Sequence, residues 1–203
     1  MEGAINHAVN HPLNGLISTN NWKNVMRMKS KDVAIVGILL ALGAVLRYFL
    51  AMLNTPLTPN MIIAFYCFAI ILVKPKIHEA LAIGFVAGIL SMLISSSVFP
   101  QANLISEPVG AYVCYIFYEL LMQREKLAPL VTTFIATLAS GFTFAGIATV
   151  FVLETILTRY HGNFLEFVAV YVPIVIITAV FNAGIVQVLC ILSKRGLVQS
   201  SAR

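Results

Sequence analysis

Six long apolar stretches, separated by short polar gaps, dominate the chain. A helix that crosses a bilayer needs about 20 apolar residues, and four of the stretches are of that length or longer. The second and fourth are shorter, but counting them as crossings keeps the basic gaps on one side of the membrane. We therefore predict an all-α integral membrane protein with six transmembrane helices. The stretches cover residues 33–53, 59–73, 80–99, 108–122, 127–153 and 167–193.

Basic residues gather in alternate gaps between these stretches. Eleven of the thirteen Lys and Arg residues lie before the first stretch, after the last, or in the second and fourth gaps. Basic side chains are retained on the cytoplasmic side of a membrane, so this bias predicts that both termini are cytoplasmic. Only Arg47 and Arg159 fall on the opposite, outer side.

The composition agrees with a membrane protein: 60% of the 203 residues are hydrophobic and 10% are charged. The net charge of +5 belongs to residues that flank membrane segments, where topology and anionic lipid explain it without a nucleic-acid partner. We predict one membrane domain at 32–196 and a short cytoplasmic tail at 197–203. The asparagine-rich segment 1–31 is interpreted as a polar cytoplasmic leader, with no cleavable signal peptide.

The chain contains no recognisable catalytic pattern. A phosphate-binding Gly-x-x-x-x-Gly-Lys-Ser/Thr loop, a His-Glu-x-x-His motif and a Gly-x-Ser-x-Gly motif are all absent from the sequence. Cys67, Cys114 and Cys190 lie inside apolar stretches without paired or metal-ligand spacing, which favours buried free thiols. We expect no enzymatic activity, no cofactor and no metal.

The gaps on the outer side are more varied than the cytoplasmic ones, and the last two are longer, which predicts a binding site at the outer mouth. They cover residues 54–58, 100–106 and 154–166. Thr58-Pro59-Asn60 and Ser106-Glu107-Pro108 each combine a hydroxyl with a proline, which is typical of a helix start. Two outward-pointing helix N-termini would attract an anionic group such as a carboxylate, although plain capping explains the same residues.

Several polar or aromatic side chains at membrane depth are candidate binding residues. Asn182 needs a partner, which is either a ligand or another helix. Arg47 either extends to the outer headgroups or provides a fixed cation for a carboxylate of the ligand or of Glu107. Tyr112 belongs to a group of aromatic residues that would stack on a planar ligand or form an interfacial belt. The full set of predicted substrate-binding residues is Arg47, Asn60, Asn103, Glu107, Tyr112 and Asn182.

Three runs of the chain carry a family resemblance. The first comprises residues 31–33 and 40–46, and the second is Thr58-Pro59-Asn60-Met61. The third is residues 103–109, with the sequence Asn-Leu-Ile-Ser-Glu-Pro-Val. Together with Asn182, they resemble substrate-binding S components of energy-coupling factor (ECF) transporters, most closely the tryptophan-transporter branch, TrpP. The resemblance covers about residues 31–193. Asn60 stands where that branch has an acid, and Glu107 stands where it has a base.

The resemblance implies an S-component bundle in a bacterial plasma membrane that captures a nutrient at the outer face. Tryptophan or a related aromatic compound is the expected nutrient, and a vitamin or vitamin precursor is the alternative. A transmembrane coupling subunit and two ATPase subunits would drive uptake, with the S component toppling in the bilayer. The family's small-x-x-x-small motif corresponds to Gly37 and Ala41, which would contact the coupling subunit.

The residues alone are also compatible with two functions of other classes. A stand-alone secondary transporter would need a coupling-ion site, and we expect no carboxylate within the membrane to carry protons. A membrane scaffold without a ligand would show no tight binding and no dependence on Asn182.

Overall fold

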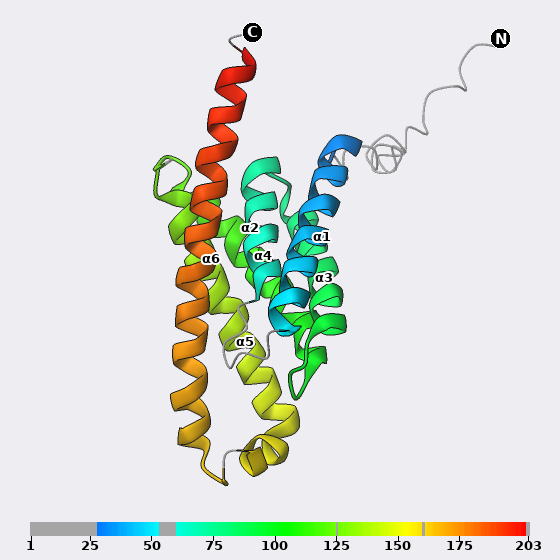
Figure 1. Ribbon diagram of the computed structural model, residues 1–203, viewed down its shortest axis with the longest axis vertical. Helices are drawn as coiled ribbons and strands as arrows, with labels where there is room; N and C mark the ends of the chain where they lie inside the picture. The colour runs from blue at the N-terminus through cyan, green and yellow to red at the C-terminus, as the bar shows by residue number, and fades with distance from the viewer. Residues whose placement is uncertain (1–27, 53–59, 125, 160, 202–203) are drawn as a thin grey trace, which may run out of the picture.

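The computed structural model describes residues 28–52, 60–124, 126–159 and 161–201, with only the backbone described from residue 194 onward. Within these ranges the chain is a bundle of α-helices without strands, as predicted (Figure 1). The predicted leader at 1–31 lies almost entirely outside the described residues, as do Thr58 and Pro59. The helices are α1 (Ser30–Met52), α2 (Met61–Val73), α3 (Ile77–Ile94), α4 (Asn103–Leu121), α5 (Ala128–Arg159) and α6 (Phe164–Ser201).

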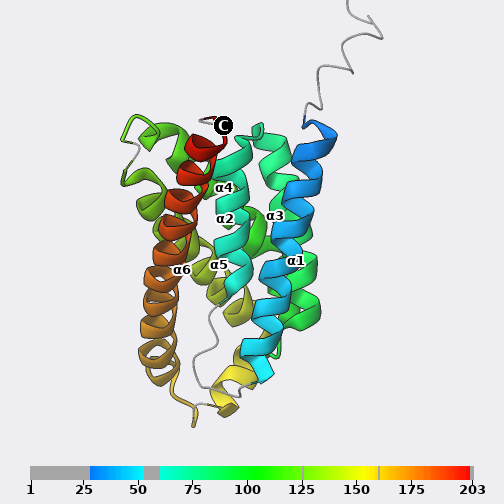
Figure 2. The ribbon, with the colours of Figure 1, turned by 45° about the horizontal axis from the view of Figure 1, so that its top comes forward.

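Five of these helices are long and apolar enough to cross a membrane, and α2 is a shorter apolar helix. The chain is therefore a multi-pass membrane protein. Helices in sequence run in opposite directions, so the start of α1 and the end of α6 lie at the same end of the bundle (Figures 1 and 2). Under the positive-inside bias this end is cytoplasmic.

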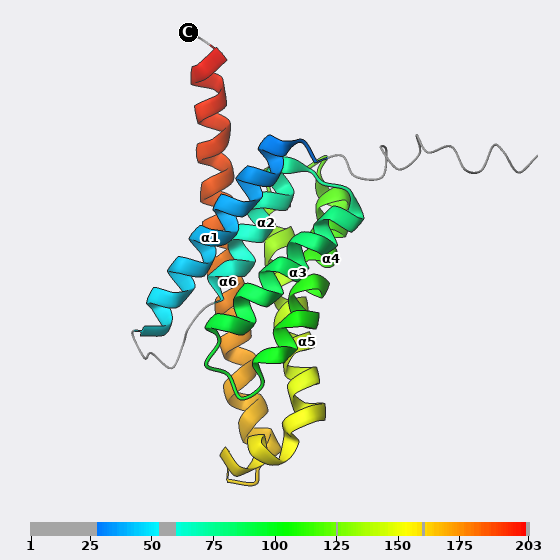
Figure 3. The same cartoon turned by 90° about the vertical axis from the view of Figure 1, so that its right-hand side faces the viewer.

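Helix α2 is the centre of the bundle. Its residues from Met61 to Ile71 are all buried, and it contacts all five other helices (Figure 3). Its 13 residues span only about 20 Å, against about 30 Å for the hydrocarbon layer. A helix surrounded by protein has no need to match the bilayer, so its outer end stops at Asn60, inside the bundle.

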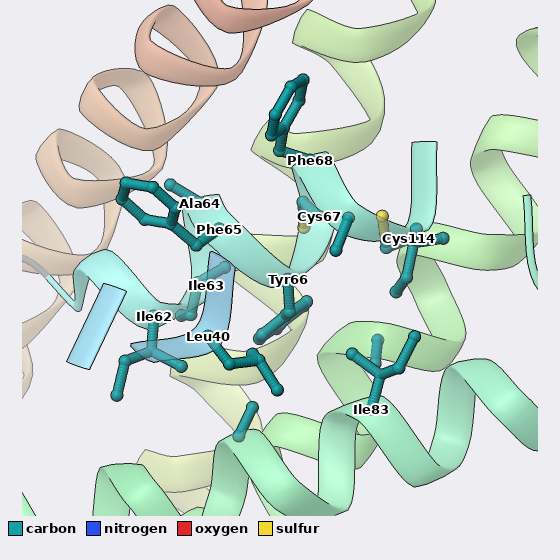
Figure 4. Close-up of a cluster of buried hydrophobic side chains, with 14 of the residues drawn as sticks. Leu40, Ile62, Ile63, Ala64, Phe65, Tyr66, Cys67, Phe68, Ile83 and Cys114 are labelled. Atoms are coloured by element: carbon teal, nitrogen blue, oxygen red, sulfur yellow. The ribbon is translucent and has the colours of Figure 1, made fainter. Parts of the chain in front are cut away.

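Close packing around α2 buries all three cysteines, as predicted. Cys67 lies beside Cys114 of α4 within the cluster that includes Leu40, Tyr66 and Ile83 (Figure 4). Cys67, Cys114 and Cys190 are free and buried. The thiols act here as small apolar groups.

Glycines on α3 allow α4 to approach closely. A Cβ on Gly84 would lie 2.7 Å from the Pro108 Cα, and one on Gly88 would lie 2.7 Å from the Asn103 carbonyl oxygen. Both distances are shorter than van der Waals contact, so any larger residue would separate these two helices. Within a membrane such contacts stabilise helix pairs, because the lipid removes the hydrophobic driving force.

The predicted start of the fourth helix at Ser106–Pro108 is wrong. The 3-10 turn η2 (Pro100–Ala102) opens this segment with a proline at its first position, and α4 follows directly from Asn103. Pro108 lies inside α4, where its missing N–H costs one backbone hydrogen bond. Glu107 is thereby placed more than one turn inside the helix rather than at its entry.

The predicted outer loop at 154–166 is also largely helical. Helix α5 continues to Arg159, and α6 begins at Phe164 after a tight turn in which Gly162 has a φ of 78°. The dihedral angles of Val152 (φ −134°, ψ 31°) interrupt α5 and change its direction. The outer parts of α5 and α6 extend beyond the other helices (Figure 1).

Candidate functional site

A cavity of about 380 Å³ occupies the space beyond the outer end of α2. All six helices contribute to its wall, together with the turn that follows α3. The short α2 creates this space, since its neighbours continue outward past Asn60. The lining residues are Arg47, Ala51, Asn60, Ile63, Ile94, Ser95, Ser96, Ser97, Asn103, Ser106, Glu107, Thr137, Ser140, Gly141, Phe144, Arg159, Tyr171, Ile174, Val175 and Thr178.

The carboxylate of Glu107 is the most buried charge in this wall, with 1% of the residue exposed. Asn60 Nδ2 donates a hydrogen bond to Glu107 Oε1 at 2.5 Å, and Ser91 Oγ donates to the same oxygen at 3.3 Å. Ser140 Oγ donates to Oε2 at 3.1 Å. These donors come from the N-cap of α2 and from α3 and α5, so three separate parts of the bundle fix the orientation of one carboxylate.

A carboxylate at membrane depth is costly and is typical of a functional site. We expected none, so that prediction is wrong. It failed because Glu107 was assigned to a helix entry at the membrane surface, whereas α4 begins at Asn103. Its hydrogen-bond donors are neutral amide and hydroxyl groups, and Arg47 is a positive charge that interacts with it electrostatically.

Arg47 and Arg159, the two basic residues on the outer side, both line this cavity. Arg47 comes from the last third of α1 and Arg159 from the last residue of α5. Arg47 Nη1 is buried and has no hydrogen-bond partner within the described part of the chain. This placement favours the fixed-cation interpretation of Arg47 over extension to the headgroups.

Two further polar atoms in the wall are buried without a partner in the described ranges. They are Asn60 Oδ1 and Ser106 Oγ. Each such atom costs about 1–3 kcal/mol if it stays unsatisfied. With Arg47 Nη1, they give the cavity free hydrogen-bonding capacity that a polar ligand would satisfy.

The other predicted site residues have different surroundings. Asn103 lines the cavity and donates through Nδ2 to the Pro100 carbonyl at 2.8 Å. Asn182 is fully buried beside the site, where its Nδ2 donates to the Asn60 carbonyl at 3.2 Å and to Thr137 Oγ1 at 3.4 Å. This is the interhelical alternative for Asn182, and it holds the backbone of Asn60 in place. Tyr112 is 40% exposed and is not part of the cavity wall.

Several residues of the wall were not predicted from the sequence. Ser140, Thr137 and Gly141 line the cavity from α5, and their three- and four-residue spacing marks one helical face. That spacing of small polar residues in a charge-free stretch was the signal available for them. Ser91 lacked such a signal, because its role depends on the close approach of α3 to α4.

The wall combines opposite charges with an apolar surface. Glu107 and the two arginines provide both signs of charge. The apolar lining residues include Ile63 of α2, Phe144 of α5 and Val175 of α6. In the described part of the chain, no group of three His, Cys, Asp or Glu residues has a geometry suited to a metal ion. The arrangement fits a small organic molecule that carries charged groups and an apolar body.

Gly37 and Ala41, the predicted contacts for a coupling subunit, lie on the outward face of α1. Both are exposed, and a Cβ on Gly37 would meet no atom within 4 Å. The buried glycine of the same helix, Gly43, instead packs against Phe65 of α2. The small residues at 37 and 41 are therefore available to another protein, and their role as a contact stays a prediction.

Comparison with known proteins identifies relatives over nearly the whole chain. The family model described as "Tryptophan transporter TrpP" matches residues 29–195. A probable tryptophan transport protein of Bacillus subtilis is 27% identical over 181 residues, covering 87% of this chain and all of the relative. A second, from Clostridium acetobutylicum, is 25% identical over 177 residues, covering 85% of this chain and 96% of the relative. No solved structure matches the chain significantly.

Proposed function

Because the chain belongs to the TrpP family of tryptophan transporters, we propose that its outer cavity captures tryptophan for uptake across the plasma membrane. The observation that carries this proposal is that one cavity holds the buried carboxylate of Glu107 and the half-buried Arg47, whose Nη1 has no hydrogen-bond partner within the described residues. An amino acid at neutral pH is a zwitterion, with one cationic and one anionic group. Such a ligand matches both charges at once.

In the proposed complex, Glu107 binds the ammonium group of tryptophan. The three hydrogen bonds from Asn60, Ser91 and Ser140 hold the carboxylate in one orientation before the ligand arrives. Arg47 lies in the same wall and binds the ligand carboxylate, since a guanidinium group matches a carboxylate geometrically. Preorganised partners of this kind reduce the entropy lost on binding.

The apolar part of the wall supports an aromatic side chain as the body of the ligand. Phe144, Ile174 and Val175 line the cavity from α5 and α6. The volume of about 380 Å³ lies at the small end of the roughly 300–1,000 Å³ that is usual for ligand sites. A single amino acid is therefore a better match than a large cofactor.

Equilibrium binding of radiolabelled L-tryptophan to the purified protein in detergent tests this proposal. We expect saturable binding that unlabelled L-tryptophan displaces and that L-leucine and L-lysine do not. Glu107→Gln, which keeps the shape but removes the charge, should weaken binding. Absence of saturable tryptophan binding by the folded wild-type protein would overturn the proposal.

We further propose that the chain is the S component of an ECF importer, with transport driven by two ATPase subunits through a coupling subunit. The exposed small residues Gly37 and Ala41 support this role, because they allow another helix to approach α1 closely. Ala41→Leu should reduce copurification with the coupling subunit and leave tryptophan affinity intact. Ala82→Leu, on the exposed face of α3, is the matched control and should copurify normally.

Burial of Glu107 also favours a second candidate, a stand-alone carrier coupled to protons. A carboxylate at membrane depth is the group that such a carrier would protonate and deprotonate. Uptake measured in cells that lack the ATPase subunits separates the two. Transport that persists without them would replace the ECF assignment with the stand-alone carrier.

A further inference from the structure

We propose that Arg159 is a specificity-determining residue that binds the carboxylate of the substrate from the outer end of α5. The inference rests on the proposed function, because it concerns how the same cavity recognises an amino acid. It assigns a role to a residue that lies far along the chain from the other charged groups of the wall.

The path of α5 shows that Arg159 is brought to the cavity by a change in helix direction. Ser140 and Arg159 both line the cavity, yet 19 residues of straight helix would separate them by about 28 Å. The non-helical dihedral angles of Val152 allow the last part of α5 to bend toward α6 at the outer end of the bundle (Figure 1). Without this interruption the guanidinium group would lie far from Glu107.

Apolar contacts hold the redirected segment in place. Ile156 is 3% exposed and packs in a small cluster with Phe167 of α6. The ring of Phe151, just before the interruption, stacks on Phe99 with their centroids 5.5 Å apart. The position of Arg159 therefore depends on buried neighbours rather than on its own charge.

The Arg159 guanidinium has no structural partner that would account for it. It forms no ion pair or hydrogen bond with any described residue, and the ion pair at this end of the bundle joins His161 to Glu166 at 3.7 Å. A basic residue on the outer side also opposes the positive-inside bias. Arg159 is exposed at the outer end of α5 and also lines the cavity, so its positive charge is accessible to the carboxylate of a ligand that enters from outside.

The charges of the wall predict that the cavity binds an amino acid more tightly than the corresponding amine. With Arg47 and Arg159 facing one Glu107, the cavity carries an excess of one positive charge. An amine that lacks a carboxylate, such as tryptamine, would satisfy Glu107 but leave both arginines without a partner. Arg159 should therefore contribute to the preference for the amino acid over the amine and contribute nothing to binding of the indole ring.

Competition binding with L-tryptophan and tryptamine tests this role in wild-type protein, Arg159→Gln and Arg159→Lys. For Arg159→Gln we expect L-tryptophan affinity to fall about 10- to 100-fold, as for loss of a charge-assisted hydrogen bond, with tryptamine affinity unchanged. Arg159→Lys keeps the charge and should retain part of the preference. Arg124→Gln, at an exposed cytoplasmic turn, is the matched control and should behave as wild type.

Each result leads to a distinct conclusion. An unchanged ratio of the two affinities in Arg159→Gln would overturn the role of Arg159 while leaving tryptophan capture intact. Equal losses for both ligands would also overturn it, since they would indicate a change in the fold of the segment. Failure of the wild-type protein to bind L-tryptophan would instead overturn the proposed function, and this inference with it.

Discussion

Substitution of Gly110 by alanine tests how the packing of α4 controls the cavity. Gly110 lies one turn deeper than Glu107 on the same helix, where α4 contacts α2 and α5. A Cβ here would overlap the Tyr66 hydroxyl and lie 2.9 Å from the Ser140 Cβ. Tyr66 is fully buried and Ser140 is 2% exposed, so neither side chain has empty space into which to move.

Two opposing contributions decide the change in stability. Alanine is more favourable than glycine in a helix by about 1 kcal/mol. Overpacking a dense core costs about 1–3 kcal/mol, which outweighs that gain. We expect Gly110→Ala to lower the free energy of unfolding by up to about 2 kcal/mol.

Tryptophan affinity should fall in the same variant, although Gly110 does not line the cavity. The added methyl group displaces Ser140, whose hydroxyl donates to Glu107 Oε2 at 3.1 Å. A hydrogen bond to a charged group contributes about 1.5–3 kcal/mol, so its partial loss corresponds to roughly tenfold weaker binding. The substitution at Gly110 affects the cavity through the contact of α4 with α5.

Thermal unfolding in detergent and equilibrium tryptophan binding measure these two effects. Gly184→Ala is the control, because Gly184 is exposed on α6 and a Cβ there meets nothing within 4 Å. This control should keep its affinity and unfold at the same or a slightly higher temperature. If Gly110→Ala matched the control in both measurements, the close approach of α4 to α5 would be refuted.

Three further predictions follow from the site and its orientation. Ser140→Ala removes one of the donors to Glu107 and should weaken tryptophan binding by roughly tenfold in the same binding assay, with little change in the melting temperature. Ser96→Cys, at the outer mouth, should react with a membrane-impermeant thiol reagent in intact cells, and Gln123→Cys should react only after lysis. The native cysteines are buried and should give low background, and the reverse labelling pattern would contradict the assigned orientation. Asn182→Ala removes the amide that holds α6 to α2 and should lower thermal stability by about 1 kcal/mol, which a melting temperature equal to wild type would contradict.

The helices could be predicted from the sequence because their signals are periodic and long. Apolar stretches of membrane length and the alternation of basic gaps depend on the bilayer, which acts on every residue in the same way. The start of α4 could not be predicted by the same means. Ser106-Glu107-Pro108 has the composition of a helix start, but Pro100 occupies that position in the structure.

The sequence identified some residues of the site but not how they contact one another, because these contacts join different helices. Asn60 and Glu107 were identified as candidates from their position near the outer ends. Their direct hydrogen bond joins residues that are 47 positions apart, and no local pattern indicates it. Ser91 and Ser140 complete the same group from two other helices. The spacing of Ser140 from Thr137 indicates its helical face, but no pattern in the sequence indicates Ser91.

The two outer arginines show how a departure from a global rule locates a site. The positive-inside bias accounts for eleven of the thirteen basic residues and leaves Arg47 and Arg159 unexplained. They lie more than a hundred residues apart in sequence, yet the fold brings both to the wall that holds Glu107. Charged side chains at membrane depth are costly and are typical of functional sites, and Arg47 Nη1 has no hydrogen-bond partner within the described residues. A zwitterionic ligand would bring an ammonium group to Glu107 and a carboxylate to the arginines, and this match of opposite charges is the physical basis for the proposed recognition of tryptophan.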